Sequence, residues 1–124
     1  MDKDILNKSD KLRIIQEIVP GKQITLAHII AAPDEVLYQK LGLDPKKDYK
    51  NASIGIVTLS PAETAVIAAD ISMKCSNIDL GFVDRFSGTL IITGSVSDTE
   101  SAVRSIVEYA KDKLGFAVCE VTRT

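Results

Sequence analysis

Two segments of the chain place their hydrophobic residues at helical spacing. In the later segment, five apolar residues fall on one face of a helix: Val103, Ile106, Val107, Ala110 and Leu114. Lys111 and Lys113 lie near the end of this segment and Gly115 follows, an arrangement that is typical of a helix C-terminus. The run Ser97–Glu100 places a serine three residues before a glutamate, so it predicts a capping box at the start of the helix.

The earlier segment predicts a helix with a face of small residues. In Ser60–Glu63 a serine, a proline and a glutamate stand in capping-box order, so we expect the helix to begin there. Its small face consists of Ala62, Ala65, Ala68 and Ala69. Such a face lets a helix lie close to a sheet or to another subunit, and the sequence leaves both possibilities open.

Short runs rich in β-branched residues, separated by turn residues, predict strands. The expected strands are 13–19, which Pro20-Gly21 ends, Gln23–Ile30, a run that starts at Ile54, Ile78–Arg85, Thr89–Thr93 and Phe116–Thr122. A tight turn at 86–88 joins two of them as a hairpin, with Gly88 supplying a positive φ. A short helix is expected at Asp34–Leu41, with Pro33 in its first position and Gly42 as a left-handed end; a charged loop at 43–52 follows.

From Ile54 onward the expected order is strand, helix, strand, turn, strand, helix, strand. This is the order of a ferredoxin-like split β-α-β unit, an α+β fold in which helices cover one face of an antiparallel sheet. With 124 residues, the chain has room for one domain. We divide it into a flexible tail at 1–12 and a domain at 13–124.

Charge and composition exclude several classes of protein. The formal net charge is -2 with signs mixed along the chain, so a nucleic-acid footprint is not expected. The opening residues form no signal peptide, and no apolar stretch approaches the length of a membrane span. Two cysteines without paired spacing, Cys75 and Cys119, fit free thiols in a reducing cytoplasm.

Candidate catalytic residues are few. His28 is the only histidine and lies in the middle of an expected strand, where a structural role is more common than catalysis or metal binding. Neither cysteine has a histidine nearby in sequence to activate it. Asp84 and Arg85 form either a functional charge pair or an ordinary pair beside a turn. Acidic residues lack metal-ligand spacing and glycines form no phosphate loop, so we expect no enzyme, no metal and no cofactor.

These patterns alone suggest an oligomeric structural or binding domain. A small ligand-binding regulatory domain of ferredoxin-like fold would have the same pattern, so this second function stays open. A third, an enzyme that uses His28 or a cysteine, has the least support. Self-association without a ligand would separate the first function from the second.

Long strings of the chain resemble one known family. These strings are RIIQEIVPGKQITLAHIIA, IGIVTLSPAETAVIAADISMK, GFVDRFSGTLIITGSV and CEVTRT, and they cover the chain from about residue 12 onward. They are similar to bacterial microcompartment shell proteins of the circularly permuted hexameric type, from ethanolamine, propanediol or choline utilisation. The resemblance implies a non-enzymatic cyclic homohexamer that tiles a protein shell in the cytoplasm. Other shell proteins and the enclosed enzymes are its further candidate partners.

The resemblance also implies roles for particular residues. Permuted members carry an extra N-terminal strand, here 13–19, and six copies of it form a parallel barrel on the hexamer axis. Alternation leaves two inward sets, Ile14, Gln16 and Ile18 or Ile15, Glu17 and Val19; we favour the first, because six converging glutamates would repel one another.

The turn Phe86, Ser87 and Gly88 corresponds to the hairpin that faces the six-fold axis, and Lys74 corresponds to a lysine at the hexamer edge. Relatives that hold an iron–sulfur cluster have cysteine at this turn, so a cluster is not expected here. Some relatives have a glycine-rich loop where this chain has Asn51-Ala52-Ser53, which leaves open whether the hexamer is flat or bent.

Overall fold

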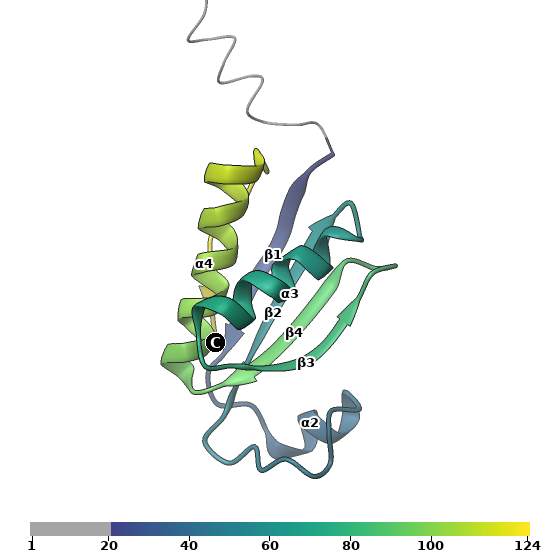
Figure 1. Cartoon of the computed structure of the whole chain (residues 1–124). Helices are drawn as coiled ribbons and strands as arrows, with labels where there is room; N and C mark the ends of the chain where they lie inside the picture. The colour runs from purple at the N-terminus through teal and green to yellow at the C-terminus, as the bar shows by residue number, and fades with distance from the viewer. Residues whose placement is uncertain (1–20) are drawn as a thin grey trace, which may run out of the picture.

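A five-stranded sheet of order β3-β4-β2-β1-β5 lies at the centre of the computed structural model, which describes residues 21–124 (Figure 1). The strands are β1 (Gln23–Ile30), β2 (Ser53–Ser60), β3 (Asp79–Asp84), β4 (Thr89–Gly94) and β5 (Thr122–Arg123). Their pairings are antiparallel except that of β1 with β5, which is parallel. The expected tail at 1–12 and the expected barrel strand, with Ile14, Gln16 and Ile18, lie outside the described residues.

Within residues 21–124, three helices accompany the sheet: α2 (Glu35–Lys40), α3 (Thr64–Cys75) and α4 (Val96–Leu114). Figure 1 shows α3 and α4 side by side over one face of the sheet, with α2 beyond one end of the strands. The predicted α+β architecture, with two long helices on one face of a mainly antiparallel sheet, is confirmed. No helix within residues 21–124 has the length and apolar character that a membrane span requires.

The main core lies between the sheet and the two long helices. Ile29, Val57 and Ile92 from the sheet are fully buried there. They meet the predicted apolar face of α4, of which Val103 and Ile106 are fully buried. Removal of this much apolar surface from water is the main stabilising term, worth about 1.5 to 3 kcal/mol for each large side chain.

The small face of α3 packs inside the subunit. Ala65, Ala68 and Ala69 are buried in the main core, while Ala62 lies before the helix. Of the two possibilities that the sequence left open, the structure therefore shows packing against the chain's own sheet and helix. These alanines are therefore not available for contacts with another subunit, because they are already covered.

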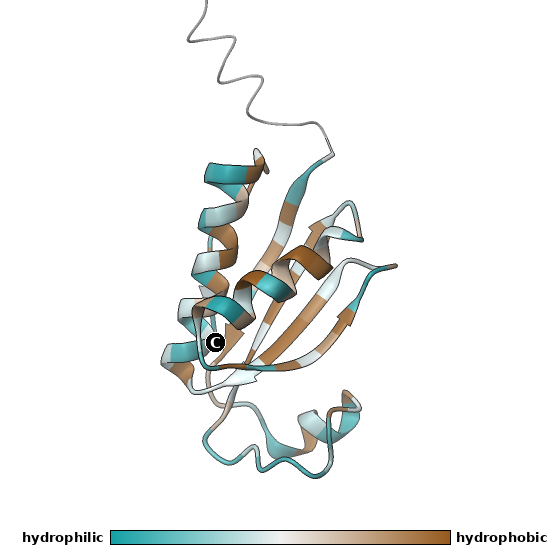
Figure 2. Cartoon of the chain, in the orientation of Figure 1, coloured by the Kyte–Doolittle hydropathy of each residue, from teal (hydrophilic) through white to brown (hydrophobic). Residues whose placement is uncertain are grey.

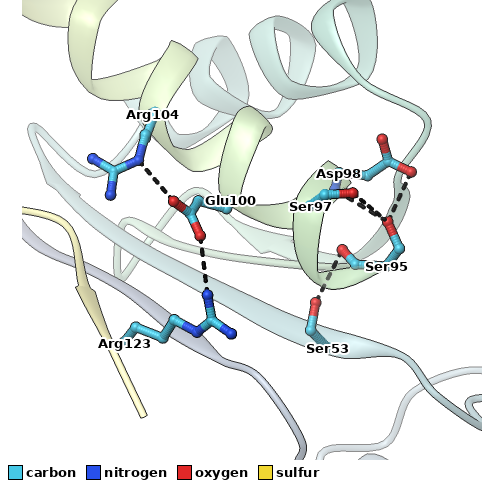
Figure 3. A network of polar contacts seen from close by, with 7 residues as sticks. All are labelled: Ser53, Ser95, Ser97, Asp98, Glu100, Arg104 and Arg123. Atoms are coloured by element: carbon cyan, nitrogen blue, oxygen red, sulfur yellow. Dashed lines mark hydrogen bonds and ion pairs between the residues drawn. The ribbon is translucent and has the colours of Figure 1, made fainter.

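Both predicted capping boxes were misplaced. Ser60 is the last residue of β2 and still pairs with Gln23, so α3 begins only at Thr64 and has no side-chain cap. The helix α4 begins two residues before the predicted position, because β4 ends at Gly94 and Ser95 follows at once. Ser95 Oγ accepts a hydrogen bond from the Asp98 backbone N–H at 3.1 Å, so Ser95 is the N-cap rather than Ser97 (Figure 3).

The C-terminal strand is shorter than predicted. Instead of spanning Phe116–Thr122, the pairing consists of an isolated bridge at Ala117 and the two residues of β5. Consecutive residues Val118 and Cys119 both pack against the core, which the alternation of a regular strand does not permit.

Glu100 of α4 connects this helix to β5 through an ion pair. Its carboxylate lies 3.1 Å from Arg104 Nε and 3.4 Å from Arg123 Nη1 (Figure 3). Arg104 lies one turn further along α4, whereas Arg123 comes from β5. The C-terminal segment is therefore held to the helix by side chains as well as to β1 by backbone pairing.

The helix α2 lies at one end of the sheet, where Tyr38 packs against the face opposite α3 and α4. Tyr38 is buried there with Leu43, Ile54 and Ile91 in a second, smaller core. The helix is one residue shorter at each end than predicted, because Asp34 is its N-cap and Leu41 its C-cap, and Pro33 therefore precedes the cap. The expected left-handed backbone after α2 and α4, at Gly42 and Gly115, is confirmed.

We predict that Ser95→Ala lowers the free energy of unfolding by about 1 kcal/mol, because it removes an N-cap acceptor. Ser97→Ala is the matched control. Ser97 lies inside the helix, where alanine is a better helix former, so its replacement should leave the stability unchanged or slightly raised. Chemical denaturation of both variants at one protein concentration tests this. A larger loss for Ser97→Ala would contradict the assignment of the cap.

Candidate interaction site at the β3–β4 turn and helix α3

The β3–β4 turn is organised around Asp84. Its carboxylate accepts hydrogen bonds from the Phe86 backbone N–H and from Ser87 Oγ, both at 2.9 Å. These bonds, that of the Phe86 N–H first, hold the pKa of Asp84 below its usual value. The turn is therefore ordered by its own side chains, although it projects from the sheet.

Gly88 fixes the turn against the neighbouring strand. Its φ is 79°, as predicted, and its carbonyl accepts a hydrogen bond of 2.8 Å from the Leu59 N–H. A Cβ at this position would lie 2.2 Å from the Leu59 carbonyl oxygen. Both the backbone conformation and the available space therefore require glycine here.

The tip of the turn presents an exposed aromatic ring. Phe86 is 81% exposed, and Arg85 Cζ lies 5.0 Å from the centre of its ring, which is the geometry of a cation–π contact. Because the Asp84 carboxylate is used inside the turn, Arg85 is directed to Phe86 and does not act as the partner of Asp84. The interpretation of this pair as turn structure agrees with the geometry.

Lys74 lies in the last turn of α3 and is exposed. Its ammonium forms an ion pair with Asp70, one turn earlier, at 2.8 Å. This hydrogen bond raises the pKa of Lys74, so the side chain stays charged at neutral pH. The same helix exposes Val66, Ile67 and Met73, a feature that the alanine pattern did not predict.

The His28 ring forms its hydrogen bonds with threonines of the C-terminal segment. The His28 ring nitrogens lie 2.6 Å from Thr122 Oγ1 and 2.9 Å from Thr124 Oγ1, so the ring joins β1 to the C-terminal segment. Cys75 and Cys119 are free thiols, as predicted. In the part of the chain from residue 21 onward, no three His, Cys, Asp or Glu side chains are placed to hold a metal ion.

A cavity of about 540 Å³ opens beside α2. It is lined by α2 and by the loop that follows, where the Tyr38 and Tyr49 rings stack at 4.2 Å. Burial raises the pKa of Tyr38, whose hydroxyl has no hydrogen-bond partner among residues 21–124. Lys47, also in the lining, is already paired with Asp79 at 2.8 Å. The stacking of Tyr49 on Tyr38 holds the charged loop beside α2, and no pattern in the sequence predicted it.

Three curated proteins are similar to nearly the whole chain. The bacterial microcompartment shell protein CutR of Streptococcus intermedius is 51% identical over 90% of this chain and 92% of its own length. The shell protein EutS of Escherichia coli K12 is 48% identical over 93% of this chain and 99% of its own length. The shell protein PduU of Salmonella typhimurium is 44% identical over 90% of this chain and 93% of its own length.

Solved structures of the relative CutR are also similar to this chain. A CutR flat hexamer superposes with a TM-score of 0.77 and 48% identity, over 86% of this chain and 94% of that chain. A CutR screw form superposes with a TM-score of 0.74 and 48% identity, over 85% of this chain and all of that chain. Residues 53–122, from β2 to the start of β5, match the BMC domain. The chain therefore belongs to the family of bacterial microcompartment shell proteins.

Proposed function

We propose that this protein is a structural tile, a cyclic homohexamer that covers part of the shell of a bacterial microcompartment in the cytoplasm. The observation that carries this proposal is the similarity to CutR chains solved as flat hexamers, at 48% identity and over 86% of the chain. The role is structural rather than catalytic, in keeping with relatives that are named as shell proteins. Other shell proteins and the enclosed enzymes are its proposed partners.

We infer further that the chain order is permuted within this family. The start of β1 lies beside Ala117, which follows α4 after two residues. The Ile24 N–H donates to the Ala117 carbonyl at 2.8 Å, and the Ala117 N–H donates to the Lys22 carbonyl at 3.0 Å. A chain in which β1 and α2 follow α4 would therefore need only a short connection. The BMC-domain match begins at residue 53, after β1 and α2, which supports the same inference.

The turn residues Phe86, Ser87 and Gly88 are proposed to face the six-fold axis. The support is their geometry: the turn projects, is held rigid by Asp84 and Leu59, and presents an exposed ring at its tip. Six copies would place a ring of aromatic side chains, each beside an arginine, around the axis. The proposed barrel of residues 13–19 would cover this ring at one end.

The unmodified protein should be a hexamer without any ligand, and should form sheets or tubes when it is concentrated. Light scattering coupled to size exclusion measures the first property and electron microscopy the second. A regulatory domain would instead change its oligomeric state on binding a metabolite. A ligand-free monomer or dimer at micromolar concentration would overturn the proposal.

If Ile14, Gln16 and Ile18 line the barrel, Gln16→Glu should lower the melting temperature of the hexamer by several degrees at pH 8. Six converging carboxylates repel one another and lose hydration, and both effects raise their pKa. The decrease in melting temperature should therefore disappear as the pH falls and the carboxylates become protonated. Glu17→Gln is the control and should have no such effect. Thermal melts of both variants at pH 5 and pH 8 distinguish the two inward sets. A melting temperature that Glu17→Gln raises at pH 8 but not at pH 5 would show that Glu17 faces inward.

We place Lys74 at the hexamer edge, where its long stem and ammonium would contact the next tile. Lys74→Ala should leave hexamers intact and suppress sheets, since a weak contact repeats along every edge. The control is Lys111→Ala, which removes an exposed lysine from the last turn of α4. Electron microscopy of concentrated protein makes the comparison. Sheets of Lys74→Ala as abundant as those of the control would leave Lys74 with roles inside its own helix alone, the ion pair with Asp70 and an interaction with the helix dipole.

A further inference from the structure

The cavity beside α2 is large enough for a small organic molecule. Its volume of about 540 Å³ is in the range of roughly 300 to 1,000 Å³ that is usual for ligand pockets. Its walls come from α2 and the loop that follows, and Figure 2 shows this loop as largely hydrophilic, whereas the sheet contains many hydrophobic residues. The lining combines apolar with charged side chains: Glu35, Tyr38, Leu43, Asp44, Lys47 and Tyr49.

Contacts within the chain fix the walls of this cavity. The Tyr49 ring stacks on Tyr38 at 4.2 Å, and the Tyr49 hydroxyl donates a hydrogen bond of 3.1 Å to the Asp44 carbonyl. The ion pair between Lys47 and Asp79 ties the same loop to β3. The site is therefore formed before any ligand binds, so binding does not have to order the loop.

The charges in the lining are not balanced. The Lys47 ammonium is paired with Asp79, which lies outside the lining, and the hydrogen bond between them raises the pKa of Lys47. Within residues 21–124, neither Glu35 nor Asp44 forms an ion pair. One oxygen of Asp44 accepts a hydrogen bond of 2.9 Å from the Lys46 backbone N–H. The lining thus holds two carboxylates without a cation, which favours a positively charged ligand.

Tyr38 gives a second indication of a ligand. It lines the cavity and is only 2% exposed, yet its hydroxyl has no hydrogen-bond partner among residues 21–124. A buried hydroxyl without a partner costs free energy. Burial raises the pKa of Tyr38, so the hydroxyl stays protonated at neutral pH, and its oxygen can accept a hydrogen bond from an N–H group. Aromatic rings are also favourable neighbours for a cation.

We propose that this cavity binds a small primary ammonium ion with a short alkyl chain. The ammonium lies between Glu35 and Asp44, and the alkyl chain contacts Leu43 and the tyrosine pair. A primary ammonium has three N–H donors, which match the two carboxylates and the Tyr38 oxygen. Most of the charged lining is exposed to solvent, so the affinity should be weak, in the millimolar range. Binding needs only the single chain and does not depend on the proposed hexamer.

Two probes of equal length test the class of ligand. Calorimetric titration of the unmodified chain with n-butylammonium, at an ionic strength held constant with sodium chloride, should give saturable binding. Under the same conditions n-butanol should bind at least about tenfold more weakly, because it lacks the charge that strengthens a hydrogen bond to a carboxylate. Absence of saturable n-butylammonium binding, or equal affinity for n-butanol, would overturn the proposal.

Glu35→Gln tests the place of binding, and Glu63→Gln is its matched control. Both glutamates are exposed and lie at the start of a helix, but Glu63 is outside the cavity. Glu35→Gln should weaken n-butylammonium binding about tenfold, the value of one hydrogen bond between charged groups, whereas Glu63→Gln should leave it unchanged. A Glu35→Gln variant with native circular dichroism that binds as tightly as the control would overturn the site.

Asp44→Asn repeats the test at the second carboxylate. The asparagine oxygen can still accept the hydrogen bond from the Lys46 N–H, so the loop should keep its conformation while the charge is lost. The affinity for n-butylammonium should again fall about tenfold, and an unchanged affinity would contradict the proposed position of the ammonium. Size exclusion of the same samples records the oligomeric state, so a failure of this site is distinguished from a failure of the proposed hexamer.

Discussion

The close approach of α3 and α4 to the sheet is the constraint on which the rest of the structure depends. It is possible because the contact surfaces are small: three alanines on α3, and Gly55 in the centre of β2. A Cβ at Gly55 would lie 2.9 Å from side-chain atoms of Ile92 and Thr99 and 3.0 Å from one of Val103. With the helices this close to the strands, the large aliphatic residues interlock around them and exclude water.

This arrangement determines which surfaces remain for assembly. Since the alanines of α3 are used internally, the side chains that this helix leaves exposed for other subunits are those on its opposite side. The β3–β4 turn is likewise set by an internal contact, the hydrogen bond between Leu59 and Gly88. The same interactions that stabilise the single chain therefore orient the groups proposed to meet between chains.

The sequence predicted the elements well and their ends less well. Periodicity located α4, β1 and the hairpin, because burial on one face imposes a regular pattern on each. It misplaced the starts of α3 and α4, because a Ser-x-x-Glu run does not show where the preceding strand ends. Strand β2 extends through Ser60 and leaves α3 without a side-chain cap, whereas β4 ends at Gly94, so that Ser95 caps α4. It also extended the last strand, since Val118 and Cys119 are apolar but lie where alternation is broken. For the candidate site, the family resemblance suggested roles for Lys74 and the turn, which stay predictions. The exposure of Val66 and the Tyr38–Tyr49 stack became visible only once burial and packing were known.

The hydrogen-bonded contact between Lys22 and Ala117 has a consequence for protein engineering. Where two distant segments of a chain already touch, they can be joined, and the polypeptide can be opened elsewhere with its packing retained. The charged loop between α2 and β2 is exposed over most of its length and offers such an opening. A fused enzyme or fluorescent protein would then leave the domain from beside α2 instead of beside β1. A change of connectivity alone would thus place the fused protein at either of two positions on the tile, beside β1 or beside α2.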